Sequence, residues 1–348
     1  AMYGQSNQNY FRCVLTLLSV FRVMDAKLNL KIQTITDPFK CVSEEMPWME
    51  SNTALIKLLD GKTFSIPGSK ATVAWEQNRL LGITKAGPNG PVGMRNTLID
   101  AYALSRDSHV LSNLIELAKS FAPYLADLLR EEIEVINKIL AYSAEEWEEV
   151  KINFSQPLIQ LRALDDKLKG FDKGLEWPLL KLGKLSTKIE AAGKVRVFAM
   201  VDIWTQSVMD PLHRGIFSLL RSIKMDGTFD QLNPMTRLYN LPHGQRFSFD
   251  LSAATDRLPI KLQQQILSIL LESQSLAKNW AETLIGREYH LSFKGEDYHL
   301  KYSVGQPMGA LSSWGMLALT HHVIVQIAAE RAGLKGLFLD YALLGDDI

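Results

Sequence analysis

Apolar residues recur at the helical period over much of this chain. Leu111, Leu114 and Leu117, for example, would share one face of a helix. The ranges with this pattern are 11–24, 97–150, 203–224 and 260–286. Residues 310–332 contain no proline and no acid, lysine or arginine before Glu330, which predicts a helix buried around most of its circumference.

Alternating polar and apolar residues predict strands in shorter stretches. These are residues 62–66, 194–199, 246–251, 287–302 and 337–344. Lys194 and Arg196 would project from one strand face, with Glu190 placed to pair with one of them; the alternative is a basic face that is merely solvated. Residues 287–302 centre on Gly295 and predict a hairpin.

Two glycine- and proline-rich stretches predict loops. Residues 84–91 would expose backbone amides that contact a phosphate backbone, although a surface connector is an equal interpretation. Residues 303–309 precede the long apolar helix, where loop amides and serine hydroxyls are suited to a ribose or phosphate, although a core helix with a capping loop is equally compatible. His321 and His322 are neighbours in that helix and face different directions, so packing or local hydrogen bonds are expected instead of a metal pair.

Charge changes this picture only locally. The 348 residues carry 38 basic and 38 acidic side chains, so there is no global bias toward nucleic acid. Residues 131–150 hold seven acids and one lysine, whereas residues 181–224 hold eight basic residues and three acids. Two cysteines exclude a disulfide framework and a Cys-rich zinc site, and no apolar run is long enough to span a membrane. The chain begins with Ala1 and ends at Ile348, which we interpret as an internal piece of a longer protein.

Three aspartates have the pattern of metal ligands. Asp346 and Asp347 follow Gly345 between apolar residues, and adjacent acids repel each other unless a cation lies between them. Asp250 ends a predicted strand, where a carboxylate would face a cleft. Each feature has an ordinary alternative, since Gly-Asp-Asp is commonly a surface turn and nearby Asp256 could simply be an acid in the first turn of a helix.

In this order, the segments resemble the motifs of viral RNA-dependent RNA polymerases, and more narrowly the mitovirus and narnavirus replicases. The resemblance runs from about residue 80 to the end. The matching segments are Thr84-x-x-Gly87-Pro88 (motif G), Lys188-x-Glu190 with Lys194-x-Arg196 (motif F), residues 249–259 (motif A), residues 305–314 (motif B) and Gly345-Asp346-Asp347 (motif C). Motifs A and B are long and close to family-specific, whereas G and C alone are weak.

The resemblance implies an α+β right-hand polymerase. Residues 1–200 would be a helix-rich fingers region with motifs G and F. Residues 201–348 would be a palm with motifs A, B and C, and a fingers insertion at about 260–302. Asp250 and the two terminal acids would lie on adjacent strands of an antiparallel palm sheet, and the thumb would be absent from this chain.

The resemblance also implies roles for individual residues. Asp250, Asp346 and Asp347 would be catalytic and would bind two Mg²⁺ ions, or Mn²⁺. Nucleoside triphosphates would contact Lys188, Lys194, Arg196, Asp256, Ser312 and Ser313, with Asp256 sensing the ribose 2′-hydroxyl. The RNA template would contact Thr84, Gly87, Pro88, Gly305, Gln306 and Gly309. Motif B departs from the usual pattern, because Leu317 stands where many polymerases of this type have the ribose-recognising Asn.

The function implied is RNA-directed RNA synthesis on a single-stranded template, with nascent RNA and NTPs as partners and no obligate protein partner. Family resemblance places it in the host mitochondrion. Two alternatives stay open. A reverse transcriptase is disfavoured, because Asp256 stands where an aromatic gate would exclude the 2′-hydroxyl. A remnant or fragment that is inactive or only binds RNA would lack whatever follows the acids.

Overall fold

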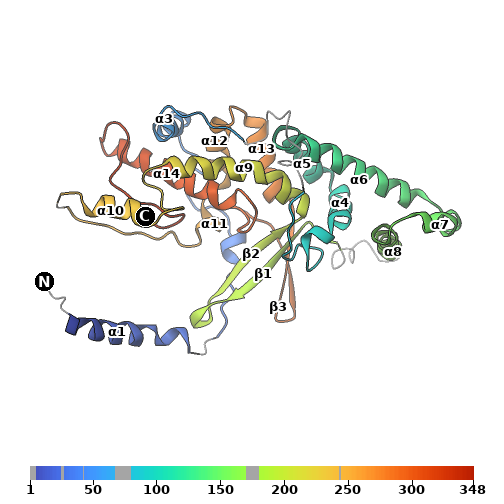
Figure 1. The fold of residues 1–348 in the computed structure, drawn as a ribbon, viewed down its shortest axis with the longest axis horizontal. Helices are drawn as coiled ribbons and strands as arrows, with labels where there is room; N and C mark the ends of the chain where they lie inside the picture. The colour runs from blue at the N-terminus through green and yellow to red at the C-terminus, as the bar shows by residue number, and fades with distance from the viewer. Residues whose placement is uncertain (1–4, 25–26, 42, 67–79, 170–179, 243) are drawn as a thin grey trace.

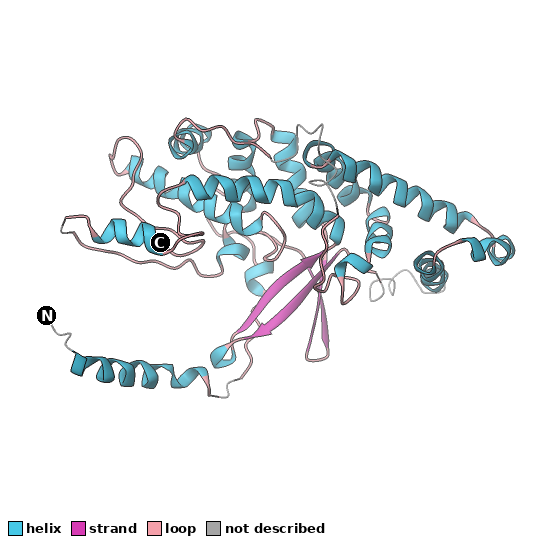
Figure 2. Cartoon of the chain, in the orientation of Figure 1, coloured by secondary structure: helices cyan, strands magenta, loops and turns pink. Residues whose placement is uncertain are grey.

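The computed structural model describes residues 5–24, 27–41, 43–66, 80–169, 180–242 and 244–348. It combines helices with one four-stranded sheet, an α+β architecture (Figure 2). The helices are α1 (Gln5–Ser19), α2 (Gln33–Thr36), α3 (Trp48–Leu59), α4 (Thr97–Ser105), α5 (Ser108–Phe121), α6 (Pro123–Ala141), α7 (Ala144–Val150), α8 (Gln156–Lys169), α9 (Ile203–Ser222), α10 (Leu232–Tyr239), α11 (Ala254–Arg257), α12 (Ile260–Leu270), α13 (Gln274–Ile285) and α14 (Ser313–Arg331). The strands are β1 (Gly183–Ile189), β2 (Val195–Val201), β3 (Tyr289–Phe293) and β4 (Glu296–Leu300). None of the helices in these ranges is long and apolar enough to cross a membrane.

The helices confirm the ranges predicted from apolar periodicity. Residues 97–150 form α4 to α7, and α5 begins where the Asp107 carboxylate accepts a hydrogen bond from the Val110 amide. Helices α9 and α14 lie side by side through the middle of the molecule (Figure 1). Both are lined with buried side chains, including Trp204 of α9, and α14 is buried around most of its length as expected for an apolar helix without charge.

The sheet has the order β2-β1-β3-β4 and is mixed. β1 pairs antiparallel with β2, and β3 pairs antiparallel with β4 through a turn at Lys294 and Gly295, both with positive φ. β1 and β3 meet in parallel at Lys184 and His290. This sheet does not contain Asp250 or the two terminal acids, so it does not test the antiparallel palm sheet expected for them. One sheet face is apolar and packs into the core, with Leu185 and Leu291 each 1% exposed.

Three predicted strands do not form. Residues 62–66, 246–251 and 337–344 have no regular element, apart from isolated bridges at Asp250, Leu343 and Leu344. The first stretch runs along α9, where the Ser65 carbonyl approaches Gly215, so its apolar residues are half-buried against a helix instead of a sheet. In the second, Phe247 is 71% exposed, so its alternation does not mark a buried face.

Candidate active site

The chain end pairs with the segment that carries Asp250. Asp250 and Asp347 are partners in an antiparallel bridge, across 97 positions of sequence. The amide of Phe249 donates to the Ile348 carbonyl at 2.8 Å, and the Leu251 amide donates to the Asp346 carbonyl at 3.2 Å. Figure 1 shows the C-terminus beside the segment that follows α10. The predicted adjacency of Asp250 to the two terminal acids is therefore present in the backbone, although the pairing is too short to make named strands.

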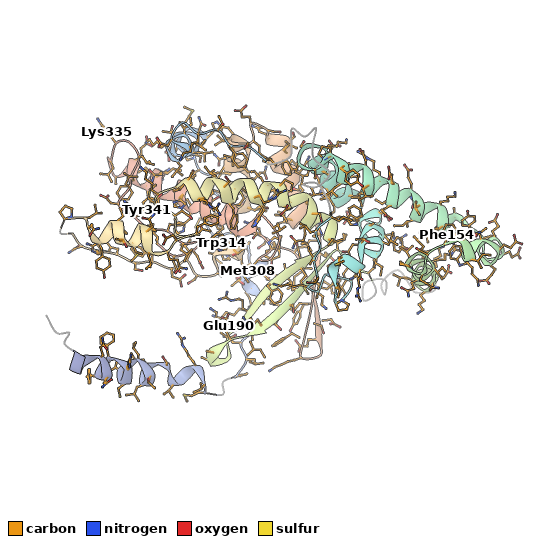
Figure 3. All side chains as sticks on the ribbon, viewed as in Figure 1. Phe154, Glu190, Met308, Trp314, Lys335 and Tyr341 are labelled. Carbon is orange, nitrogen blue, oxygen red and sulfur yellow. The ribbon has the colours of Figure 1, made fainter. Side chains whose placement is uncertain are left out.

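A tight turn presents the two terminal acids. Leu344 and Asp347 exchange backbone hydrogen bonds of 2.9 and 3.0 Å, and Gly345 between them has φ +63°. A Cβ atom at Gly345 would lie 3.0 Å from the indole Nε1 of Trp314, which is labelled in Figure 3, so both conformation and space favour glycine here. His321 Nδ1 donates to the Gly345 carbonyl at 2.9 Å, which fixes the turn to α14.

Behind this turn lies a buried hydrogen-bonded chain. His322 Nε2 donates to the Asp226 carboxylate at 3.1 Å, and its Nδ1 lies 2.8 Å from the Tyr341 hydroxyl. Burial lowers the pKa of His322, and the neighbouring Asp226 opposes this, so a neutral ring accepts at Nδ1 from the tyrosine. His321 and His322 are thus packed in the core and make hydrogen bonds, but to residues far away in the sequence and not locally as expected.

The three acidic side chains face outward without a protein cation to neutralise them. Asp250 and Asp347 are exposed, Asp346 is half-buried, and none has an ion pair within the described ranges. Their ligand atoms do not form a closed group: in the described ranges, the one set of three or more ligand groups within 4.8 Å of one another lies elsewhere. Such an open carboxylate arrangement fits Mg²⁺, which takes one or two protein carboxylates and completes its shell with water and phosphate oxygens.

The predicted basic residues lie together at the tip of the β1–β2 hairpin. Lys188 and Arg196 are direct cross-strand partners and therefore share a sheet face. Glu190, labelled at the hairpin tip in Figure 3, lies 3.0 Å from Arg196 Nε and 3.8 Å from Lys194 Nζ. The predicted pairing of Glu190 with a cation is confirmed, and all three cations remain exposed enough to meet a ligand.

The glycine-rich loop before α14 connects the acidic segment to the basic hairpin. The Gly305 amide donates to the Asp256 carbonyl at 3.0 Å, and a Cβ there would lie 2.2 Å from the Thr255 carbonyl oxygen. Gly309 has φ +118°, and a Cβ there would lie 2.3 Å from the Ala199 carbonyl oxygen of β2. Both glycines are required by close backbone approach, which places the loop between α11 and β2.

Three side chains that are predicted to contact template or nucleotide are buried in this structure. The amide of Gln306 is fully buried and donates to the Ser313 carbonyl at 2.9 Å. Ser312 Oγ accepts from the indole of Trp280 at 2.9 Å, and Ser313 is 2% exposed. Gln306, Ser312 and Ser313 are thus buried in this structure, and their contacts with template and nucleotide stay a prediction.

The predicted template loop, residues 84–91, is partly buried and makes hydrogen bonds to other parts of the protein. Thr84 is exposed, but Gly87 and Pro88 are buried, and the Gly87 amide donates to the Gly90 carbonyl at 2.9 Å. The side chain of Asn89 bonds Asp100 at 2.7 Å and the backbone of residue 181 at 2.8 Å. The Gly87 amide is therefore used within the loop and is not exposed as expected, and the Asn89 side chain connects the loop to the residues just before β1.

Sequence reasoning missed the partner of Asp256. Thr34 Oγ1 donates to Asp256 Oδ2 at 2.7 Å, from a segment 222 positions earlier in the chain. The adjacent Arg257 donates to the carbonyls of Asp37 and Pro38, which holds the same N-terminal segment against α11. Burial raises the pKa of Asp256, and the Thr34 hydrogen bond and Arg257 oppose this rise. A single threonine within the short helix α2 carries no sequence signal for such a role.

The chain thus carries a basic hairpin, an exposed acid, a glycine loop and an acidic turn bridged to that acid, in the order seen in RNA-dependent RNA polymerases. Residues 73–348 match the family model of the mitovirus RNA-dependent RNA polymerase. The chain therefore belongs to the mitovirus RNA-dependent RNA polymerase family.

Three curated relatives were found. The RNA-directed RNA polymerase of Cryphonectria parasitica mitovirus 1 is 37% identical over 97% of this chain and 37% of its own length. Two uncharacterized mitochondrial proteins of Arabidopsis thaliana are 43% and 31% identical over 38% and 37% of this chain, covering 53% and 63% of their own lengths. The chain thus spans less than two thirds of each relative that it matches.

Proposed function

We propose that this chain is the fingers and palm part of an RNA-directed RNA polymerase that adds ribonucleotides to an RNA 3′ end on an RNA template. The observation that carries the proposal is the antiparallel bridge between Asp250 and Asp347, which brings the acids of two distant motifs to one place. Membership of the mitovirus polymerase family supports the same reaction.

The acids supply the metal chemistry in this proposal. Asp250 and Asp346 are the main ligands for two divalent ions, Mg²⁺ or alternatively Mn²⁺, with Asp347 assisting. When bound, such ions lower the pKa of the primer 3′-hydroxyl and stabilise the charge on the leaving pyrophosphate. The chain itself contributes the turn at Gly345, which packs against Trp314 and accepts a hydrogen bond from His321. This turn keeps the two acids beside Asp250.

The basic hairpin and Asp256 would hold the incoming nucleotide. Lys188, Lys194 and Arg196 offer point charges and a planar fork that suit a triphosphate. Glu190 keeps two of these cations in place and sets the position of Arg196. Asp256 would sense the ribose 2′-hydroxyl through its carboxylate, which Thr34 orients. The exposed Thr84 and the loop around Gly305 and Gly309 would lie along the template.

The proposed subdomains follow from the family resemblance. Residues 1–200 are assigned to the fingers and residues 201–348 to the palm of a right hand, with 260–302 as a fingers insertion. Support for the insertion comes from β3, which joins the sheet of β1 and β2 across the Lys184–His290 pair. By resemblance and by the mitochondrial relatives, the place of action is the host mitochondrion, with single-stranded RNA, nascent RNA and NTPs as partners.

Primer extension with the intact parent polymerase tests the proposal. Asp250→Ala and Asp346→Ala should each lower nucleotide incorporation by more than about 100-fold while leaving RNA binding intact. Asp340→Ala is the matched control, since Asp340 is an exposed acid of the same segment and should tolerate the change. Retention of most activity in both variants would contradict the assignment. RNA binding by a wild-type parent enzyme that incorporates nothing would favour the remnant, and a preference for deoxynucleotides would favour a reverse transcriptase.

A further inference from the structure

A second group of ligand side chains lies on the β3–β4 hairpin, at the opposite edge of the sheet from β2. Glu288, His290 and His299 each place one ligand atom within 4.8 Å of the other two. His290 and His299 are direct cross-strand partners, and their ring centroids are 4.4 Å apart. Glu288 lies two residues before His290, so its side chain leaves the same face of the sheet.

The backbone that carries these groups is fixed on its other side. Tyr289 and Leu291 of β3 are 0% and 1% exposed and pack into the core, and Leu300 of β4 is 6% exposed. The two strands are closed by the Lys294–Gly295 turn and held to β1 at His290. Ligands that project from paired strands keep their spacing, so an ion would meet a site that already has nearly its final shape.

The ion pairs that Glu288 makes within this group are long. The Glu288 carboxylate lies 3.9 Å from His299 Nδ1 and 4.0 Å from Lys301 Nζ, so neither contact is a hydrogen bond.

We propose that Glu288, His290 and His299 bind one divalent transition-metal ion of the zinc class. Two imidazole nitrogens and one carboxylate oxygen form a donor set that suits Zn²⁺ and that Mg²⁺, which prefers oxygen, does not favour. The site joins β3 to β4 through one ion and leaves a fourth position for water. It is separate from the aspartates of the polymerase site and does not depend on the proposed function.

Metal binding by the 348-residue chain tests this site. After treatment with a chelator, the protein is titrated with Co²⁺ and Zn²⁺, and the visible absorption of protein-bound cobalt and the midpoint of thermal unfolding are recorded. The wild type should bind one ion and unfold at a higher temperature in its presence. Millimolar Mg²⁺ should not displace the bound cobalt. Glu288→Gln and His299→Ala should each weaken binding by about tenfold or more; both residues are partly exposed, so the variants should fold.

The matched control is His109→Ala. His109 Nε2 lies 3.1 Å from the Glu282 carboxylate, and among the described residues no third ligand group joins this pair. This variant should bind cobalt like the wild type. Absence of stoichiometric cobalt binding by the wild type would overturn the proposal. Equal binding by the wild type, Glu288→Gln and His299→Ala would also overturn it, because the ion would then be held by other residues.

Discussion

Replacing Thr34 by valine removes one hydroxyl from Asp256 while keeping the shape of the side chain. In the structure this hydroxyl donates to Asp256 Oδ2 at 2.7 Å. A hydrogen bond to a charged group contributes about 1.5–3 kcal/mol. Asp256 is only half-buried, so water can replace part of the lost bond and the lower end of this range applies. A loss of about 1.5 kcal/mol corresponds to roughly a tenfold change in an equilibrium or rate ratio.

The loss should appear as weaker selection of ribonucleotides. Burial raises the pKa of Asp256, and the Thr34 bond opposes that rise. Without the bond, the carboxylate is less well oriented and its pKa rises further, so at a given pH a smaller fraction is charged and able to accept from a 2′-hydroxyl. We expect the ratio of ATP to dATP incorporation, compared as kcat/KM in the intact parent polymerase, to fall about tenfold. The fall should be larger at lower pH.

Two control variants separate the hydroxyl from the segment that carries it. Thr34→Ser keeps a hydroxyl and should keep most of the discrimination. Thr36→Val removes a hydroxyl that bonds only the Ile32 carbonyl, at 3.4 Å, and should have no effect. Unchanged discrimination in Thr34→Val, together with a loss in Asp256→Asn, would refute the role of Thr34. Unchanged discrimination in both variants would move ribose sensing away from Asp256, while the Asp250→Ala result would still decide the reaction itself.

Two further predictions concern stability. Burial raises the pKa of Asp100 from 3.8 to about 7, so the folded state binds more protons than the unfolded state between those values and stability falls as pH rises through them. In urea titrations the free energy of unfolding should fall by about 3 kcal/mol from pH 5 to pH 8. This fall should be smaller in Asp100→Asn and unchanged in Asp127→Asn, which replaces an exposed acid as a control. An equal fall in the wild type and both variants would refute the assignment to Asp100. Gly309→Ala should destabilise the protein by more than about 2 kcal/mol, because a Cβ would lie 2.3 Å from the Ala199 carbonyl oxygen. Gly333 also has a positive φ, but it faces open space, so Gly333→Ala should destabilise the protein less. Equal thermal shifts in the two glycine variants would show that the close approach does not matter.

The helices and the basic hairpin could be predicted because their patterns are local. Residues 97–150 place apolar side chains at the helical period, and Lys194 to Ala199 alternate between a solvent face and a core face. The hairpin around Gly295 follows from a glycine that can adopt positive φ between two alternating runs. In each case the information lies within a few residues of the element that it specifies.

The remaining features depend on contacts that no local pattern encodes. Thr34 reaches Asp256 only because residues 33–38 pack beside α11, which a single sequence does not reveal. Gln306 and Ser312 are polar residues in a glycine loop, so they resemble ligand contacts. The structure instead uses them to satisfy buried partners at Ser313 and Trp280. The apolar run at 337–344 is buried by packing on α14 and not by pairing in a sheet.

Helix α14 therefore determines where the acidic turn lies. Three of its few polar residues face the segment that leads to the acids. His321 forms a hydrogen bond with the Gly345 carbonyl, and His322 forms one with the Tyr341 hydroxyl. Gln326 both donates to and accepts from the backbone of Phe338. His322 and Gln326 are four residues apart and share one side of the helix. Because most of the helix is buried, it cannot move without disturbing the core. The acids are thus positioned by side chains from a rigid buried helix, and the short bridge to Asp250 only completes an arrangement that α14 already sets.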